Sequence, residues 1–245
     1  MSDSSRFPIQ QLDELTIDQI AAGEVVERPA QVVKELVENS IDSGSKKIRI
    51  EIVNGGFSRI SVIDDGHGIP KEELKLAIKR HATSKISSSE DLRTIVTKGF
   101  RGEALASIAA VSKMTLSSKV RGSEGFSITV DNGLVEDIEL TSVPPGTKVD
   151  VQNLFQKIPA RLSFQRRPST ENSAIVDIAI SLALSESKVG ILVEIDGRTV
   201  LDCPPCDSMD DRLYDLFGTT SSKLIPLESS EVDKDAPGRE NWDGW

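Results

Sequence analysis

One amphipathic helix followed at once by two short strands constrains the fold of this chain most. Residues 30–43 carry apolar side chains on a single face with a period near 3.6, namely Val32, Val33, Leu36, Val37 and Ile41. Gly44 is placed to end this helix. Residues 48–52 then alternate Ile with charged residues, Asn54-Gly55-Gly56 is a hairpin turn signal, and residues 59–63 are predicted to be the returning strand. Each element has one apolar side, so we expect helix and strands to pack in layers.

The rest of the chain mixes further helices with hairpin-linked strands. Helices are predicted over residues 16–26, 71–80, 103–110, 174–184 and 208–217. Strands are predicted near residues 113–120, 125–131, 134–140, 147–152, 189–195 and 198–202. This order predicts an α+β fold, a two-layer α/β sandwich with a mostly antiparallel sheet and helices on one face. Residues 81–102 are rich in Ser, Thr and Lys and are predicted to form a long mobile loop, of the kind that is usually functional.

The charge balance and the apolar content exclude several classes of protein. The 245 residues include 29 Lys and Arg and 39 Asp and Glu, a formal net charge of −10, which argues against a general nucleic-acid coat. No run approaches the ~18 apolar residues of a membrane span, and the N-terminus lacks an apolar signal sequence, so neither membrane insertion nor secretion is expected. Cys203 and Cys206 are too few for a four-ligand zinc site and are expected to be reduced thiols in a loop.

The polar side of the helix over residues 30–43 carries a candidate catalytic pair. Glu35, Asn39 and Asp42 lie within about 60° of one another at 100° per residue, and Glu35 and Asn39 are neighbours because they are four residues apart. An Asn oxygen is a neutral ligand that suits Mg²⁺, and a nearby Glu can accept a proton from water. Taken alone, the same pattern is also that of a solvated helix face.

Three further segments have features of a binding site. The sequence Asp64-Asp65-Gly66-His67-Gly68 ends the strand over residues 59–63, and its glycines allow the backbone to approach a flat ligand or a phosphate closely. An Asp fixed at the end of a strand can accept a hydrogen bond from an exocyclic amine, although an acidic turn is the simpler alternative. Residues 98–105 form a Gly-rich loop that enters a helix, which suits either an anion-binding site or a plain helix cap, and they lack the Walker pattern. Gly146-Thr147 begins a strand and indicates nothing by itself.

Together these segments resemble the four nucleotide-binding motifs of the GHKL (Bergerat-fold) ATPases. Residues 19–29, 34–40, 80–85 and 99–105 read QIAAGEVVERP, KELVENS, RHATSK and GFRGEAL. This wording resembles the MutL-type DNA mismatch repair proteins within that superfamily. The resemblance is dense over residues 9–120 and thinner to about residue 217. It implies a GHKL ATPase region that binds ATP with Mg²⁺ and hydrolyses the nucleotide.

The resemblance also implies a role for each matching residue. Glu35 matches the general base that activates the attacking water, and Asn39 matches the Mg²⁺ ligand. Asp64 matches the acceptor for the adenine amino group, with Thr147 near the adenine. The remaining matches contact the nucleotide through a turn under base and ribose, through the start of an ATP lid and through a loop around the phosphates, namely Gly66, Gly68, Thr83, Ser84, Lys85, Arg101, Gly102, Glu103, Ala104 and Leu105.

The chain departs from the family pattern in three places. Asp65 stands where the family usually carries Asn, which adds a second carboxylate beside Asp64. Gln156-Lys157 replaces a usual Tyr-Asn pair before Pro159. We expect residues 1–217 to form the ATPase domain and residues 218–245 to be either the truncated start of a second domain or a disordered acidic tail. In the family, that second domain contributes a Lys to the γ-phosphate, so slow hydrolysis is expected.

The resemblance implies partners as well. They are a second copy or a MutL-type paralogue in an ATP-dependent dimer, and a MutS-type mismatch recognition protein. DNA is expected to bind weakly and mainly through absent domains, because the basic stretch of Lys157, Arg161, Arg166 and Arg167 is either a solvated turn or a weak backbone contact. The protein is expected to be intracellular, cytoplasmic in a prokaryote and nuclear in a eukaryote. The alternative function is a non-catalytic nucleotide-binding module that acts through partners.

Overall fold

The computed structural model describes residues 9–85, 98–99, 102–223, 227–228 and 243–244. The helices are α1 (Glu14–Val25), α2 (Pro29–Asp42), α3 (Lys71–Ala77), α4 (Ala104–Ala110), α5 (Pro159–Ser163), α6 (Pro168–Ser185) and α7 (Met209–Phe217), with 3-10 turns η1 (Asn54–Gly56) and η3 (Gly218–Lys223). The strands are β1 (Lys47–Val53), β2 (Arg59–Asp64), β3 (Lys113–Lys119), β4 (Gly125–Asp131), β5 (Leu134–Val135), β6 (Glu139–Thr141), β7 (Gly146–Gln152), β8 (Gly190–Ile195), β9 (Arg198–Cys203), β10 (Leu227–Glu228) and β11 (Asp243–Gly244).

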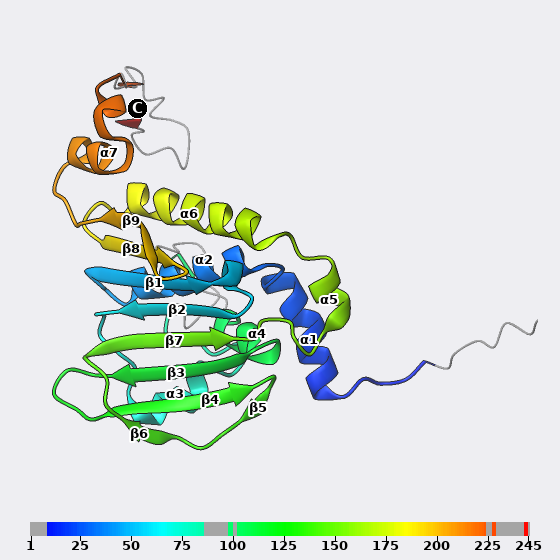
Figure 1. The fold of residues 1–245 in the computed structure, drawn as a ribbon. Helices are drawn as coiled ribbons and strands as arrows, with labels where there is room; N and C mark the ends of the chain where they lie inside the picture. The colour runs from blue at the N-terminus through cyan, green and yellow to red at the C-terminus, as the bar shows by residue number, and fades with distance from the viewer. Residues whose placement is uncertain (1–8, 86–97, 100–101, 224–226, 229–242, 245) are drawn as a thin grey trace, which may run out of the picture.

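A single large sheet organises the described residues (Figure 1). Its strands run in the order β5-β4-β3-β7-β2-β1-β8-β9, and β6 pairs with β4 beside β5. All neighbours in this sheet are antiparallel except β1 and β8, which run parallel. Parallel neighbours need a long crossover connection, and here the chain between β1 and β8 contains β2 to β7 and α3 to α6. The mostly antiparallel α+β fold predicted from the sequence is therefore confirmed.

The two faces of the sheet differ in chemistry. Helix α2 packs against β1 and β2, α4 against β3 and β4, and α6 against β8 and β9. The side chains of Ile48, Ile50 and Ile52 are at most 1% exposed beneath these helices. The alternate residues Arg49, Glu51 and Glu194 pair on the opposite face, at 3.0 Å for Arg49–Glu51 and 2.7 Å for Arg49–Glu194. The period-2 alternation thus separates an apolar core from a charged outer face.

A buried ion pair fixes the start of α2. Arg28 occupies the N-cap position before Pro29, and its Nε lies 3.1 Å from Oε2 of Glu171 in the first turn of α6. The Glu171 side chain is fully buried, while that of Arg28 is 27% exposed. Because an unpaired carboxylate is costly in an apolar interior, this contact holds the two helix starts together.

Most sequence-predicted elements are present with shifted ends. The predicted helix over residues 174–184 starts earlier, at Pro168, and the predicted strand over residues 134–140 is two short strands, β5 and β6. Helix α5 was not predicted, because it is five residues long and leaves Leu162 and the adjoining Phe164 exposed, so it has no apolar period. The middle of the predicted loop, residues 86–97, and most of the predicted tail lie outside the described residues.

We predict that Arg28→Met destabilises the fold by about 3 kcal/mol, because the buried carboxylate of Glu171 would lose its charged partner. The control is Arg49→Met, which removes an Arg that is 49% exposed and should cost within about 1 kcal/mol. Urea unfolding of both variants measures the two free energies. The double variant Arg28→Met/Glu171→Leu should regain most of the loss. Equal effects of the two single variants would contradict the role given to this pair.

Candidate functional site

The carboxylate of Asp64 is the most constrained polar group of the candidate site. It lies at the end of β2 and the residue is only 9% exposed. Ser40 Oγ of α2 donates to Oδ2 at 2.8 Å, and the backbone N–H groups of Gly66 and Thr147 donate to Oδ1 at 2.9 and 3.2 Å. Burial raises the pKa of Asp64, and these hydrogen bonds oppose that rise. Three structural elements thus hold one acceptor in a fixed position.

The backbone around Asp64 approaches so closely that two positions accept only glycine. Gly68 has a φ of +75°, and a Cβ there would lie 2.4 Å from the carbonyl oxygen of Lys119. Gly146 has a φ of +121°, and a Cβ there would lie 2.0 Å from the carbonyl oxygen of Asp64. Both conformations and both contacts exclude a side chain. The two glycines therefore let the turn after β2 and the start of β7 come together.

Ser118 links the same two segments and was not singled out from the sequence. Its Oγ accepts from the N–H of Ile69 at 2.8 Å and donates to the carbonyl of Gly146 at 2.9 Å. It also lies 3.0 Å from Oγ1 of Thr147. A Ser on β3 carries no sequence signal for this role, because its partners are 28 to 49 residues away in the chain.

The second carboxylate of the turn, Asp65, is used elsewhere. Its Oδ1 accepts from the backbone N–H groups of Lys46 and Lys47 at 2.7 and 2.9 Å, just before and at the start of β1. An Asn oxygen can accept the same two bonds. Asp65 therefore takes no part in the described hydrogen bonds that hold the Asp64 carboxylate.

The polar face of α2 carries a second cluster of contacts. Lys85 Nζ donates to Oδ1 of Asn39 at 2.8 Å and to Oδ2 of Asp42 at 2.6 Å. Glu35 is half-buried on the same helix, four residues before Asn39. Ser40 follows Asn39, so α2 joins this cluster to the Asp64 acceptor. Glu35 and Asn39 therefore lie on α2 with Lys85 in contact, and Asp64, Gly66 and Thr147 lie together near the C-terminal end of the same helix.

The remaining predicted residues flank this cluster. Thr83 Oγ1 accepts from the N–H of Lys85 at 3.2 Å, and Ser84 is exposed between them. A Cβ on Gly102 would lie 2.6 Å from the carbonyl oxygen of Ala82, so the two ends of the long segment meet there. Glu103 is the N-cap of α4 and its carboxylate lies 3.5 Å from His81, while Ala104 and Leu105 begin the helix. Arg101 lies outside the described residues.

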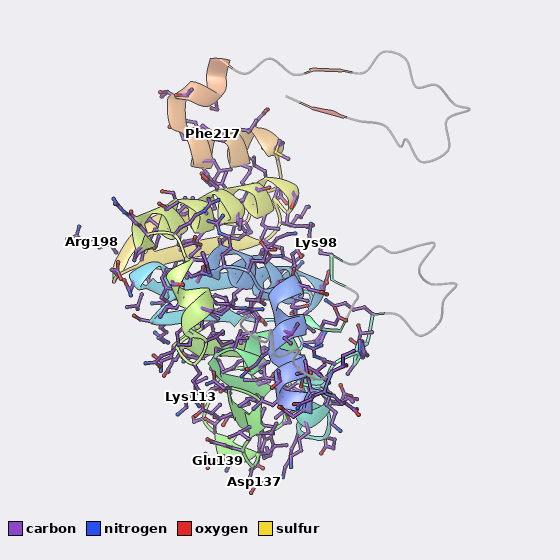
Figure 2. All side chains as sticks on the ribbon, turned by 90° about the vertical axis from the view of Figure 1, so that its right-hand side faces the viewer. Lys98, Lys113, Asp137, Glu139, Arg198 and Phe217 are labelled. Atoms are coloured by element: carbon purple, nitrogen blue, oxygen red, sulfur yellow. The ribbon has the colours of Figure 1, made fainter. Side chains whose placement is uncertain are left out.

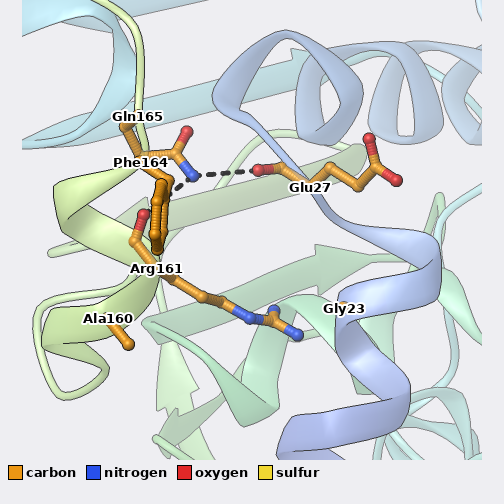
Figure 3. Close-up of a pocket in the computed structure, with 6 residues that line it drawn as sticks. All are labelled: Gly23, Glu27, Ala160, Arg161, Phe164 and Gln165. Atoms are coloured by element: carbon orange, nitrogen blue, oxygen red, sulfur yellow. Dashed lines mark hydrogen bonds between the residues drawn. The ribbon is translucent and has the colours of Figure 1, made fainter.

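A cavity of about 350 Å³ lies away from all of these residues, between α1 and α5 (Figure 3). Its lining consists of Gly23, Glu27, Ala160, Arg161, Phe164 and Gln165. The Arg161 guanidinium reaches over Gly23, and its Nη2 donates to the carbonyl oxygen of Gln19 at 3.2 Å. Lys157 pairs with Asp131 at 3.0 Å. Two of the four charges in the basic stretch are thus already engaged within the chain.

In the part of the chain that the structure describes, no helix is both long and apolar enough to cross a membrane, and no group of three or more His, Cys, Asp or Glu could hold a metal ion. The two Cys are free thiols, and burial raises the pKa of Cys203.

Comparison with known proteins identifies the family. The model of the histidine kinase-, DNA gyrase B- and HSP90-like ATPases matches residues 27–158. The DNA mismatch repair protein MutL of Acidiphilium cryptum is 46% identical over 225 residues, which cover 91% of this chain and 38% of that protein. MutL of Streptococcus pneumoniae is 44% identical over 94% of this chain and 36% of its own length. The chain therefore spans less than two-fifths of the length of these relatives.

Solved structures agree with this family. The MutL ATPase domain of Aquifex aeolicus complexed with ADP has a TM-score of 0.65 and 30% identity, over 83% of this chain and 72% of that one. The N-terminal domain of a DNA repair protein has a TM-score of 0.72 over 86% of this chain and 65% of its own; at 24% identity it supports the fold alone. With the family model matched over the segment that holds α2, Asp64 and α4, the chain belongs to the histidine kinase-, DNA gyrase B- and HSP90-like ATPase family, in its MutL-type branch.

Proposed function

We propose that this chain binds ATP with Mg²⁺ between α2 and the ends of β2 and β7, and hydrolyses it slowly as the ATPase region of a MutL-type mismatch repair protein. The observation that carries the proposal is the buried Asp64 carboxylate, which is held by Ser40, Gly66 and Thr147. Of these donors, Ser40 directly follows Asn39 on α2. The ADP complex of the Aquifex relative supports nucleotide binding by this fold.

Asp64 would recognise the base. Its three described donors are neutral, so none of them offsets the charge of the ionised carboxylate, which can accept a further hydrogen bond. An exocyclic amine is a neutral donor that fits such an acceptor, and a hydrogen bond to a charged group is stronger than one between neutral groups. Guanine presents a carbonyl oxygen at the corresponding position, which Asp64 would repel. Adenine specificity follows from this one group.

Asn39 would hold Mg²⁺ through its side-chain oxygen. The ammonium group of Lys85 lies 2.8 Å from that oxygen and 2.6 Å from Asp42, so a positive charge is already stabilised there. One amide ligand suits Mg²⁺, which keeps water and phosphate oxygens for its other positions. When bound, the metal neutralises charge on the phosphates. Lys85 and the backbone of Gly102 to Leu105 would also contact the phosphates.

Glu35 would act as the general base. It is one helical turn before Asn39, so it can hold a water beside a nucleotide bound at that residue and accept its proton. Phosphoryl transfer depends on charge neutralisation and an oriented water more than on covalent chemistry. In the MutL-type resemblance a Lys of a second domain also contacts the γ-phosphate. Losing one electrostatic contact of this kind typically costs ~3–4 kcal/mol, so we expect the 245-residue chain assayed alone to turn over slowly.

The cellular role follows from the same family and is part of this proposal. Nucleotide binding would order the segment after Lys85 and promote pairing with a second copy or a MutL-type paralogue. The pair would then signal between a MutS-type mismatch recognition protein and later repair steps inside the cell. Weak DNA contact by this chain is consistent with a net charge of −10.

We predict that Asp64→Ala weakens ATP binding by ~1.5–3 kcal/mol, because the adenine amine loses a charged acceptor. The preference for ATP over GTP should disappear with it. Asp65→Asn is the matched control, since an Asn oxygen can still accept from Lys46 and Lys47, and its ATP affinity should be unchanged. Isothermal calorimetry with both nucleotides measures these affinities. Unchanged ATP affinity in Asp64→Ala would show that Asp64 does not bind the adenine.

We predict that Glu35→Ala retains ATP binding but loses turnover, because binding depends on other groups. Phosphate release and calorimetry on the same preparation separate the two effects. Turnover in Glu35→Ala equal to that of the unaltered chain would rule out Glu35 as the base. If the unaltered chain binds ATP and releases no phosphate even with a separately expressed second domain, the non-catalytic alternative is correct.

A third prediction concerns pH. The raised pKa of Asp64 means that the folded chain binds a proton there more tightly than the unfolded chain does. The stabilising contribution of the protonated form is complete below the unfolded value of 3.8 and is lost as pH rises through the folded pKa. Without nucleotide, Asp64→Asn should therefore gain stability relative to the unaltered chain as pH rises from about 4 toward neutrality. Urea unfolding across this range tests the sign, and a pH-independent difference would contradict it.

A further inference from the structure

Asp42 binds three donors that come from both sides of residues 86–97. Besides Lys85 Nζ at 2.6 Å, its carboxylate accepts from the backbone N–H groups of Lys98 and Gly99, each at 3.1 Å. Its side chain is 8% exposed, so these bonds form in a largely water-free environment. A buried carboxylate with one ammonium and two amide donors is well satisfied, and removal of its charge would leave the ammonium unpaired.

These contacts place other groups beside the candidate metal ligand. Lys85 Nζ bridges Asp42 to Oδ1 of Asn39, and a Cβ on Gly99 would lie 3.4 Å from the same oxygen. The side chain of Lys98, labelled in Figure 2, reaches the end of α6, where its Nζ lies 3.1 Å from Glu186. Residues 98–99 are therefore held between the ends of α2 and α6, and four residues separate Gly99 from the start of α4 at Ala104.

We propose that Asp42 is a positioning residue for the nucleotide site, which acts by holding Lys85 and the backbone of residues 98–99 against Asn39. This inference rests on the proposed nucleotide binding and adds a residue to it. Asp42 does not touch the nucleotide. It keeps the ammonium group next to Asn39, where the phosphates and their metal ion would lie, and it fixes the backbone that leads to α4.

A direct metal role for Asp42 makes a different prediction. A carboxylate that ligates Mg²⁺ contributes to affinity only when the metal is present. A positioning residue contributes with and without metal, because Lys85 and the loop backbone contact the phosphates in both cases. Measuring ADP affinity in Mg²⁺ and in a chelator therefore separates the two roles.

The test compares Asp42→Asn with Glu38→Gln in the full chain. Glu38 lies on the same helix next to Asn39, pairs with Lys34 at 3.6 Å, and makes no contact with Lys85, Lys98 or Gly99 among the bonds that the structure describes. Asp42→Asn should weaken ADP binding about tenfold or more both with Mg²⁺ and with chelator, while Glu38→Gln should leave it unchanged. Thermal unfolding of both variants checks that they fold.

A double-mutant cycle tests whether Asp42 acts through Lys85. Lys85→Gln should also weaken ADP binding, and the double variant Asp42→Asn/Lys85→Gln should lose clearly less than the product of the two single losses. If Asp42→Asn fails to fold, Lys85→Gln is measured with and without Mg²⁺ in its place. In that case an affinity equal to that of Glu38→Gln overturns the inference.

Amide hydrogen exchange tests the tether without any ligand. The amides of Lys98 and Gly99 should be protected in the unaltered chain and in Glu38→Gln, and should exchange about tenfold faster or more in Asp42→Asn, because their charged acceptor is gone.

Each remaining outcome overturns the inference in a distinguishable way. Equal exchange in all three proteins shows that the tether is absent. A loss of ADP affinity that occurs only with Mg²⁺ shows that Asp42 is a metal ligand. If the losses of the two single variants simply multiply in the double variant, Asp42 does not act through Lys85. If the unaltered chain binds ADP and the Asp42→Asn and Glu38→Gln variants have the same ADP affinity, the positioning role alone is overturned. If the unaltered chain binds no ADP, the proposed function is overturned as well.

Discussion

The buried carboxylate of Asp64 is the interaction on which the rest of the site depends. A carboxylate at 9% exposure is costly unless its oxygens are hydrogen-bonded, and here the donors come from α2, from the turn after β2 and from the start of β7. Satisfying this one group therefore requires the helix layer and two neighbouring strands to meet at a single point. The glycines at 68 and 146 make that meeting possible, because a Cβ at either position would collide with backbone oxygen. The pKa of Asp64 is raised by burial despite these hydrogen bonds, which means that the ionised carboxylate still costs the fold some stability.

Helix α2 carries this constraint to the rest of the molecule. Its apolar face packs on β1 and β2, and Arg28 ties its first turn to the buried Glu171 of α6. Near its C-terminal end, Ser40 contacts Asp64 while Asn39 and Asp42 contact Lys85. At 100° per residue Asn39 and Asp42 lie on the same side of the helix, while Ser40 points about 100° away from Asn39 toward Asp64, so in the proposed site one rigid element would serve both the phosphate end and the base end of a nucleotide.

The sequence allowed the sandwich, the hairpin over residues 48–63 and the grouping of Glu35 and Asn39 to be predicted, because these depend on local period and short spacing. The MutL-type resemblance singled out Asp64 and residues 101–105 as nucleotide contacts, an assignment that stays a prediction, and no local sequence pattern fixes how these segments lie relative to each other. Contacts between distant segments were missed. Ser118 gives no signal on a strand, and Asp42 was noted on the helix face without its partners, which lie 43 to 57 residues away. The sequence also could not show what the second carboxylate, Asp65, contacts, since its bonds to Lys46 and Lys47 depend on how β1 and β2 pair.

Two carboxylates near the end of α2 are thus satisfied in opposite ways, and this difference assigns them different chemistry. Among the described residues no cation pairs with Asp64, so its charge stays available to a neutral donor, and an amine on a flat base is the ligand that such a group selects. Asp42 is paired with the ammonium of Lys85, so together they are close to neutral and leave Asn39 in a region that tolerates both a cation and phosphate charge. Exchanging the two environments would place an unpaired negative charge beside the phosphates and a cation beside the base. In the proposed site, this separation of an unpaired and a paired carboxylate at one helix end would let the same element bind two chemically opposite ends of a single ligand.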